Sequence, residues 1–401
     1  MQAEFVKSMR KTHTIYMPQM LYYHNDLLRA AFCFGGYQLK IVPEYPHYEN
    51  EVASLINKDY CTCAIGIIGN IMCFLKDASC DPDKVAFLEP QAGGACRAGN
   101  YYNLIIECLH KTGYDRIPVI SLNYQGNEKH SGFQINARML MAAAAAVCYS
   151  DLLMTLVEQI RPYECNEGET DRLHEKWLAR LSDSIKQGKN IIGRKKIYDH
   201  IIRDFKKIKT EKRQLSKVGI VGEIYIKYSP VGNCHLEEFL RKRSCDYRQG
   251  GFLNYCIYVV YSDMKNKELL RNKKIEIAAY QKVIDFLCNI QKGVTDALCT
   301  HGMKCDAPFG EMIKIKEEIL SDYYNIGDGW LMAAEAIDLI RQGYDKILIV
   351  HPFGCLVSHV GGRGAIKAIN DKYPNARITS IEYDYDQSKT LRESRLLLAI
   401  S

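Results

Sequence analysis

The sequence predicts an α/β protein with two Rossmann-like or flavodoxin-like parallel-sheet domains joined by a helical segment. Three observations support this class. Apolar strand patterns alternate with helix patterns over residues 1–130, strand patterns are almost missing over 131–215, and the alternation returns over 216–401. Strands that alternate with helices form parallel sheets covered by helices on both faces. We therefore expect an α/β domain, a helical connector and a second α/β domain with these boundaries.

The elements of the first domain follow from hydrophobic periodicity and from glycines that end helices. A short apolar run bounded by turn residues indicates a buried strand, and apolar residues three or four positions apart indicate a helix. The predicted strands cover 12–17, 39–42, 85–88 and 118–122, and the predicted helices cover 19–34, 49–57, 64–76 and 101–112.

The same signals continue through the rest of the chain. The connector is predicted to hold helices over 140–160, 171–186 and 197–208. In the second domain we expect strands over 218–226, 346–350 and 377–382, with helical segments over 235–242, 265–300, 328–342, 356–370 and 391–400.

Composition places the chain among packed globular proteins, with 47% hydrophobic and 25% charged residues. The longest apolar run, Met139–Val147, is shorter than the roughly 18 residues of a membrane span. Met1–Arg10 lacks the apolar core of a signal peptide. We therefore expect a cytoplasmic protein without membrane contact. The net charge of +6 is modest, and the basic run Lys206–Arg213 is interpreted as a solvated helix face, so no nucleic-acid partner is expected.

Cysteine is the informative residue type. The chain has 16 cysteines in 401 residues, which is well below the density of a secreted disulfide scaffold. Disulfides are disfavoured in a reducing cytoplasm, where thiols serve as buried hydrophobes, catalytic groups or metal ligands. A thiol-rich chain is also typical of a protein that seldom meets oxygen.

The loop at 91–101 follows a predicted strand and opens a helix. Ligands bind beyond the carboxyl ends of parallel strands, and glycines such as Gly94 allow the backbone to approach them. Cys96 would lie at a helix N-terminus, where the macrodipole lowers a thiol pKa, and Arg97 adds positive charge. This environment favours a cluster-binding thiolate. A phosphate-binding loop with a bystander cysteine is an equally good interpretation.

The loop at 351–364 repeats this arrangement in the second domain, with Cys355 between an apolar strand and a helix. A tight turn with a buried thiol would explain Cys355 alone. Two cysteines in equivalent turns of two similar domains are harder to dismiss. If the domains face each other, Cys96 and Cys355 reach a common site at the domain junction.

Cys61-Thr62-Cys63 opens a third helix. We expect the two side chains to diverge, so that Cys61 is a ligand and Cys63 its neighbour. Zinc remains an alternative, but structural zinc usually takes four ligands in close pairs. Three dispersed cysteines better fit an iron–sulfur cluster with one open iron.

Polar residues near the same edge are secondary candidates. Glu223, Tyr225 and Lys227 lie near the end of the predicted strand at 218–226, with Asn233 and His235 close behind, and could orient ligands or substrate. The segment 301–305, with a histidine and a cysteine, could form a metal corner, but an ordinary polar loop is favoured.

A helix cap and ordinary packing explain Asp328, Trp330 and Glu335. No phosphate-binding Walker loop is present, so ATP hydrolysis is not expected of this chain.

Several motifs together resemble a known family. The segments at 86–91, 94–101, 222–230, 327–332 and 352–356 are similar to the 2-hydroxyacyl-CoA dehydratase superfamily. The similarity is greatest to the C-terminal, non-ATPase portion of large CoA-substrate-specific enzyme activase proteins, and it runs from about Lys11 to the end of the chain.

The resemblance implies an iron–sulfur cluster, either 4Fe–4S or of the double-cubane type, held at the domain junction by Cys61, Cys96 and Cys355. Cys61 matches a cysteine eight residues before a glycine, here Gly69. Cys63 stands where relatives usually have proline, so Cys63 could replace or assist Cys61. Val357-Ser358 replaces a Pro-Asn pair.

The resemblance also implies partners. Electrons would come from a separate ATP-hydrolysing activator with an actin-like fold, and an acyl-CoA or a small reducible molecule would be the substrate. Relatives pair cluster-bearing subunits, which implies a homodimer. The protein would then be a dehydratase-like lyase or a reductase component in electron transfer. The alternatives are a non-catalytic partner or scaffold of such a system, and a metal-free nucleotide-binding α/β protein.

Overall fold

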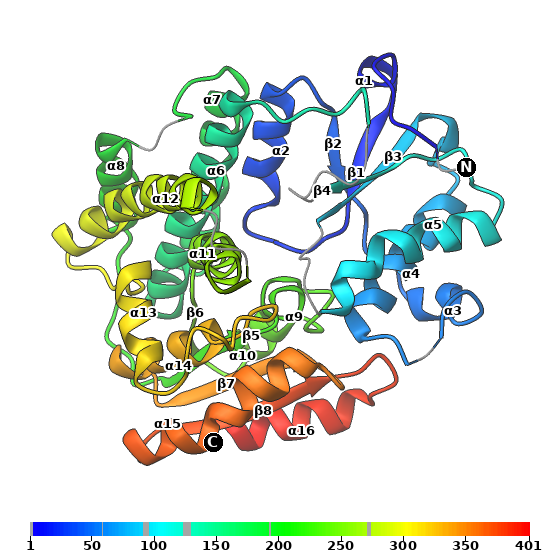
Figure 1. Cartoon of the computed structure of the whole chain (residues 1–401). Helices are drawn as coiled ribbons and strands as arrows, with labels where there is room; N and C mark the ends of the chain where they lie inside the picture. Colours follow the sequence, from blue (N-terminus) through cyan, green and yellow to red (C-terminus); the bar gives the residue numbers. More distant parts are fainter. Residues whose placement is uncertain (1–2, 58, 91–95, 123–129, 192–193, 271–273) are drawn as a thin grey trace.

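A computed structural model describes residues 3–57, 59–90, 96–122, 130–191, 194–270 and 274–401. The described residues form two four-stranded parallel sheets with helices around them (Figure 1). This confirms the predicted α/β class with two parallel sheets. The predicted division into domains at 1–130, 131–215 and 216–401 stays a prediction.

The first sheet has the strand order β2-β1-β3-β4. Its strands are short and mostly buried, as expected for a parallel sheet that helices cover. The strands are β1 (Thr14–Met17), β2 (Leu39–Ile41), β3 (Val85–Pro90) and β4 (Val119–Leu122). The helices of this part are α1 (Met9–Thr12), α2 (Asn25–Phe34), α3 (Tyr48–Val52), α4 (Thr62–Lys76) and α5 (Tyr101–Lys111), with short 3-10 turns at Pro82–Lys84 and Arg97–Asn100.

The second sheet repeats this arrangement with the order β6-β5-β7-β8. Val218 on β5 pairs with Tyr247 on one side and Lys346 on the other. The strands are β5 (Ser216–Gly222), β6 (Cys245–Gln249), β7 (Lys346–Pro352) and β8 (Arg377–Tyr383). Around them lie α9 (Ile224–Tyr228), α10 (Leu236–Arg241), α14 (Leu331–Arg341), α15 (Ile366–Lys372) and α16 (Lys389–Ile400), with a π turn at Ser358–Gly362 and a 3-10 turn at Arg363–Ala365.

A group of long helices lies beside the two sheets (Figure 1). It combines the predicted connector with helices that follow β6, so it is drawn from two parts of the chain. Its members are α6 (Ala137–Ile160), the 3-10 turn Arg161–Tyr163, α7 (Glu169–Lys186), α8 (Lys195–Phe205), α11 (Phe252–Leu270), α12 (Lys274–Thr300) and α13 (Phe309–Glu317).

Helix α6 extends well beyond the apolar run Met139–Val147. With the turn that follows, Ala137–Tyr163 is long and apolar enough to cross a membrane by length and composition alone. However, 78% of its most apolar window is buried inside the protein. The core helix of a globular protein has the same properties.

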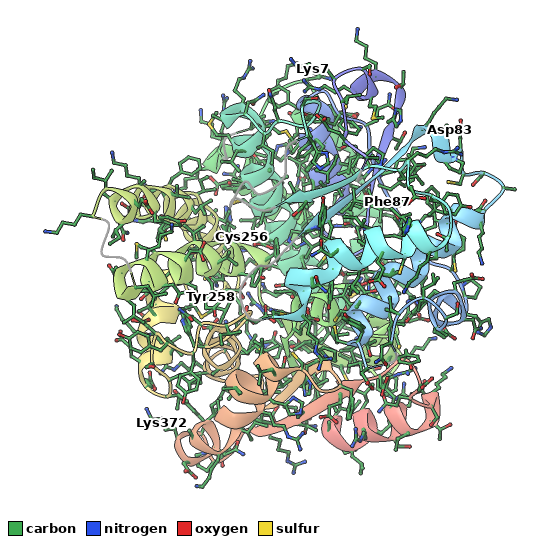
Figure 2. All side chains as sticks on the ribbon, turned by 45° about the vertical axis from the view of Figure 1, so that its right-hand side comes forward. Lys7, Asp83, Phe87, Cys256, Tyr258 and Lys372 are labelled. Carbon is green, nitrogen blue, oxygen red and sulfur yellow. The ribbon has the colours of Figure 1, made fainter. Side chains whose placement is uncertain are left out.

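Hydrophobic packing joins the two halves. One buried cluster contains Ile68 of α4 and Phe87 of β3 together with Ile226 of α9 and Leu348 of β7. Figure 2 labels Phe87 and, on α11, the equally buried Tyr258, whereas Lys7, Asp83 and Lys372 lie exposed at the periphery.

The carboxyl ends of the two sheets meet at this contact. The Ser229 hydroxyl, just after α9, donates to the carbonyl of Gln19, which follows β1, at 2.8 Å. The Thr62 hydroxyl at the start of α4 donates to the carbonyl of Tyr383, the last residue of β8, at 3.1 Å. Loops that follow strands of either sheet are therefore brought face to face.

Several features differ from the sequence-based expectation. The strand predicted over 218–226 ends at Gly222, because Glu223 begins α9 by accepting a hydrogen bond from the Ile226 N–H at 2.9 Å. Strand β6 was not predicted, and neither was helix α13. The predicted helix over 356–370 is broken into a π turn, a 3-10 turn and α15.

Candidate functional site

The cysteines singled out from the sequence lie at the facing edges of the two sheets. Cys61 is the N-cap of α4, and Cys63 lies in its first turn. Cys96 is the N-cap of the 3-10 turn that leads into α5. Cys355 follows β7. Gly94, the other predicted binding residue, lies outside the described residues.

Sheet topology explains why these loops form a crevice. In the order β2-β1-β3-β4 the connections after β1 and β3 run in opposite directions, which opens a gap beyond the strand ends. The Cys96 loop follows β3 at this point. In the second sheet the equivalent strands are β5 and β7, which are followed by Glu223 and Cys355. Both topological switch points thus contribute to one place.

The thiols of Cys61 and Cys63 are in contact, so the expectation that they diverge is wrong. The reason is that Cys61 is not helical: its backbone is extended, with ψ at 151°, and only the following residues turn into α4. The Cys63 thiol lies between the Cys61 sulfur and Oε2 of Glu223, the latter at 3.3 Å. Cys63 is therefore a direct neighbour of the crevice.

Cys61 is the most acidic of these thiols. The hydrogen bond from Cys63 is the main cause that lowers the pKa of Cys61 to about 7, against the opposing effect of burial. The Tyr101 hydroxyl, 2.6 Å from the sulfur, and the Ala64 N–H lower the pKa further. Burial, followed by the hydrogen bond with Cys61, raises the pKa of Cys63. The hydrogen bonds therefore favour the thiolate of Cys61, and burial favours the neutral thiol of Cys63.

Cys96 does not have the low pKa that was predicted. Burial raises its pKa to about 12, despite an N–H from Ala98 at 3.5 Å from the sulfur. The 3-10 turn that Cys96 caps has four residues, too short for a strong macrodipole. Arg97 points elsewhere: its exposed guanidinium donates to the carbonyl of Asp59 at 2.7 Å. Arg97 therefore fastens the loop before Cys61 instead of contacting Cys96.

Cys355 is in a similar environment. Burial raises its pKa to about 11, although the Ser358 hydroxyl and N–H lie 3.2 and 3.4 Å from its sulfur and favour the thiolate. Ser358 belongs to the Val357-Ser358 pair that departs from the related motif, and it supplies both of these donors. Cys355 also adds to the raised pKa of Cys96, after burial and the nearby acids. The two thiols thus lie within electrostatic reach of each other.

Glu223 contacts Cys63 and acts electrostatically on all four cysteines. The negative charge of its buried carboxylate raises the pKa of Cys61, Cys63, Cys96 and Cys355. In each case this effect is smaller than that of burial or of a hydrogen bond. Burial raises the pKa of Glu223 itself. The sequence placed Glu223 near the crevice on a strand, and the structure places it there as a helix cap.

Asp328 is a site residue that the sequence did not single out as such. It lies in a turn between Gly327 and Gly329, whose φ angles of +55° and +37° are in the left-handed region that glycine tolerates. The Ile224 N–H donates to Asp328, while burial and then the Glu223 charge raise the pKa of Asp328. The Gly-Asp-Gly triplet could have indicated this residue in the sequence, because a polar residue between two glycines is typical of a tight turn.

The other predicted polar residues have structural roles. Lys227 forms a buried ion pair with Glu335 at 2.8 Å, with side-chain exposures of 1% and 6%. Tyr225 packs against α4, where any side chain at Gly66 would collide with the Tyr225 hydroxyl. Asn233 accepts from the Leu236 N–H at 3.0 Å and so caps α10. His235, half exposed, pairs with Glu44 at 3.4 Å.

The thiols are donors of the chemical type that iron–sulfur clusters take. Within the described parts of the chain, no three or more His, Cys, Asp or Glu side chains are grouped to hold one metal ion. A cluster makes a different demand, because its thiolate ligands bind separate iron atoms and come from dispersed loops. Soft sulfur donors select iron–sulfur clusters, copper(I) or zinc. Cys61, Cys96 and Cys355 would hold the group, with Cys63 beside them.

No protein-family model, curated protein or solved structure matches the chain. The resemblance to the 2-hydroxyacyl-CoA dehydratase superfamily therefore stays a prediction based on the sequence motifs. The candidate site is supported by its own chemistry: four thiols and two buried acids between two sheet edges.

Proposed function

We propose that this protein binds an iron–sulfur cluster between its two sheets and acts as a redox component related to 2-hydroxyacyl-CoA dehydratases. One observation supports the proposal: thiols from three separate loops, at Cys61, Cys96 and Cys355, all lie within electrostatic reach of the buried Glu223. A cysteine that only fills space does not need other thiols and a carboxyl group nearby. Twelve of the 16 cysteines lie outside these loops.

The thiols have different tasks in this proposal. Cys61, with its pKa of about 7, offers a thiolate before any metal arrives. Cys96 and Cys355, with raised pKa values, release protons as they bind iron, so loading is coupled to proton release. Cys63 is hydrogen-bonded with Cys61, and hydrogen bonds to a ligand sulfur tune a cluster's potential. When bound, the cluster supplies one-electron chemistry and an iron that a substrate can approach.

The buried acids suit this role. Burial raises the pKa of Glu223 and Asp328 and so favours their neutral forms. Two ionised carboxylates beside several thiolates would repel them, whereas two carboxylic acids can donate hydrogen bonds to sulfur or a proton to a reduced substrate. When the cluster gains an electron, a proton from one of these carboxylic acids can balance the added negative charge.

The activator and the compartment are part of the proposal. The chain carries no Walker loop, so ATP-driven electron transfer requires a separate ATP-hydrolysing activator of actin-like fold. Thiols and cluster both fit a cytoplasm with little oxygen. The substrate is an acyl-CoA thioester or a small reducible molecule, and relatives suggest that two copies associate.

The test is ATP-dependent reduction of the cluster. Anaerobically purified protein is mixed with a related activator, dithionite and ATP, and the visible charge-transfer absorbance and the electron paramagnetic resonance spectrum are followed. We expect bleaching and a new paramagnetic signal only when both ATP and activator are present. A protein that keeps its full spectrum with activator and ATP would contradict the redox role. Reduction without turnover of any acyl-CoA or small acceptor would favour the non-catalytic partner.

A further inference from the structure

A second pair of cysteines lies at the end of α12, outside the loops that form the crevice. Cys299 is in the last turn of α12, and Cys305 is in the segment before α13. Their sulfur atoms are 3.1 Å apart. Cys299 is exposed and Cys305 is partly buried. The sequence interpretation of 301–305 as an ordinary polar loop missed this pair because Cys299 belongs to the preceding helix.

The chain between the two sulfurs is folded back on itself. Gly302, with φ at +69°, allows a left-handed turn at the end of α12, and its N–H donates to the carbonyl of Cys299 at 3.0 Å. This is a helix-ending motif that returns the following residues along the last turn. This local geometry brings Cys305 back beside Cys299.

The segment that carries Cys305 is held in place on both sides. The side-chain amide of Gln159 on α6 makes two hydrogen bonds with the backbone of Lys304, both at 2.9 Å. Asp306 accepts from Nη2 of the buried Arg248 at 2.7 Å and from the Gly251 N–H at 2.8 Å. These contacts fix the backbone next to Cys305, so its sulfur stays close to Cys299.

We propose that Cys299 and Cys305 form a thiol–disulfide exchange site that reacts with small-molecule disulfides. The exposed Cys299 thiolate attacks one sulfur of the small disulfide, forms a mixed disulfide and expels the first small thiolate. Cys305 then loses its proton to solvent and attacks the Cys299 sulfur, which closes an intramolecular disulfide and expels the second small thiolate. Two protein thiols are oxidised and one small disulfide is reduced to two thiols.

The order of the two steps follows from exposure and burial. Cys299 is open to solvent, so a small disulfide reaches it first. Burial and the hydrogen bond with Cys299 raise the pKa of Cys305 to about 12, so Cys305 acts second and only on a sulfur already in contact with it. This site is independent of the cluster proposed above.

The experiment treats reduced, anaerobically prepared protein with oxidised glutathione at pH 8 and analyses it by mass spectrometry without reduction. Trypsin cleaves after Lys292, Lys304 and Lys314, so the two cysteines fall on adjoining peptides, 293–304 and 305–314. We expect these peptides to be joined by a disulfide, with a loss of two hydrogen atoms that dithiothreitol reverses. The Cys165→Ser variant, which removes another exposed thiol, should form the same link.

A second variant separates the steps. In Cys305→Ser the resolving thiol is missing, so glutathione should remain attached to Cys299 as a stable mixed disulfide. Failure of the wild-type protein to join peptides 293–304 and 305–314 under these conditions would overturn the proposal. So would a Cys305→Ser protein whose Cys299 carries no more glutathione than Cys165. The wild-type arm needs no substitution, so a folding defect in the variant cannot decide the outcome.

Discussion

The two sheets share a strand order but carry different chemistry at their facing ends. The first sheet and its helices present thiols, at Cys61, Cys63 and Cys96. The second sheet presents one thiol, Cys355, together with the buried acids Glu223 and Asp328. The comparison teaches that a repeated topology fixes where a site forms but not what it contains. Sulfur donors come mainly from one side and carboxyl groups from the other, so the candidate site needs both sides.

The largest effect is expected when one thiol is removed from either sheet. We expect Cys96→Ala and Cys355→Ala each to abolish stable cluster binding, because a cluster that loses one of three protein ligands loses an iron. Iron and sulfide per chain, measured after anaerobic reconstitution, check this. Cys165→Ser is the matched control and should keep its iron. If only one of the two variants lost iron, the cluster would belong to a single sheet.

The next substitutions distinguish two thiols on the first sheet's side. We expect Cys61→Ser to lose most of its iron and Cys63→Ser to retain it with a shifted reduction potential, because Cys61 is the acidic thiol and Cys63 its hydrogen-bond donor. Iron analysis and a potentiometric titration measure both effects. The opposite pattern of iron loss would make Cys63 the ligand.

On the second sheet's side, Lys227 and Glu335 form a buried ion pair. Lys227→Met should destabilise the protein by about 3–5 kcal/mol, because it leaves the Glu335 carboxylate buried without its partner. Urea unfolding followed by circular dichroism measures the loss. Lys367→Met, which breaks an ion pair whose lysine is 84% exposed, should change stability by about 1 kcal/mol or less. Equal effects of the two would contradict a buried role for Lys227.

A smaller effect should appear in the pH dependence of stability, through Asp338 on α14. Burial, and then the charge of Asp306, raise the pKa of Asp338 on α14 to about 7. A carboxyl whose folded pKa is raised contributes stability below its unfolded pKa of about 4, and this contribution is lost as pH rises towards 7. Asp338→Asn keeps an oxygen acceptor for the Ala307 N–H, which Asp338 binds at 3.0 Å, and removes the titration.

The variant should therefore gain about 1–3 kcal/mol relative to wild type between pH 5 and pH 8. Urea midpoints at the two pH values measure the change, and Asp371→Asn, at an exposed position on α15, is the control. A difference between variant and wild type that does not change with pH would show that Asp338 does not titrate in this range.

Much of the fold was predictable because its strands are nearly continuous apolar runs. β7 and β3 are buried along almost their whole length and contain few polar residues, so periodicity identifies them. β6 was missed because it reads Cys-Asp-Tyr-Arg-Gln and yet is wholly buried. Its charged side chains pair with distant partners, as Nη2 of Arg248 does with Asp306, and no local pattern contains that information.

The site was predictable to a similar extent. Cysteines in loops after strands could be identified, because those loops always reach the same edge of a parallel sheet. Their acidities could not, since burial decides Cys96 and a contact with Cys63 decides Cys61. Asp328 is identified as a site residue only by its contact with Ile224 and the nearby charge of Glu223, which are about 100 positions away along the chain.

The central claim is that thiols from both sheets hold one iron–sulfur centre. The most direct measurement counts iron and acid-labile sulfide per chain in anaerobically reconstituted wild-type protein and records its electron paramagnetic resonance spectrum after reduction. We predict brown protein with iron and sulfide in equal, stoichiometric amounts and a signal typical of a reduced cluster. Colourless protein without iron, from the same preparation, would contradict the account.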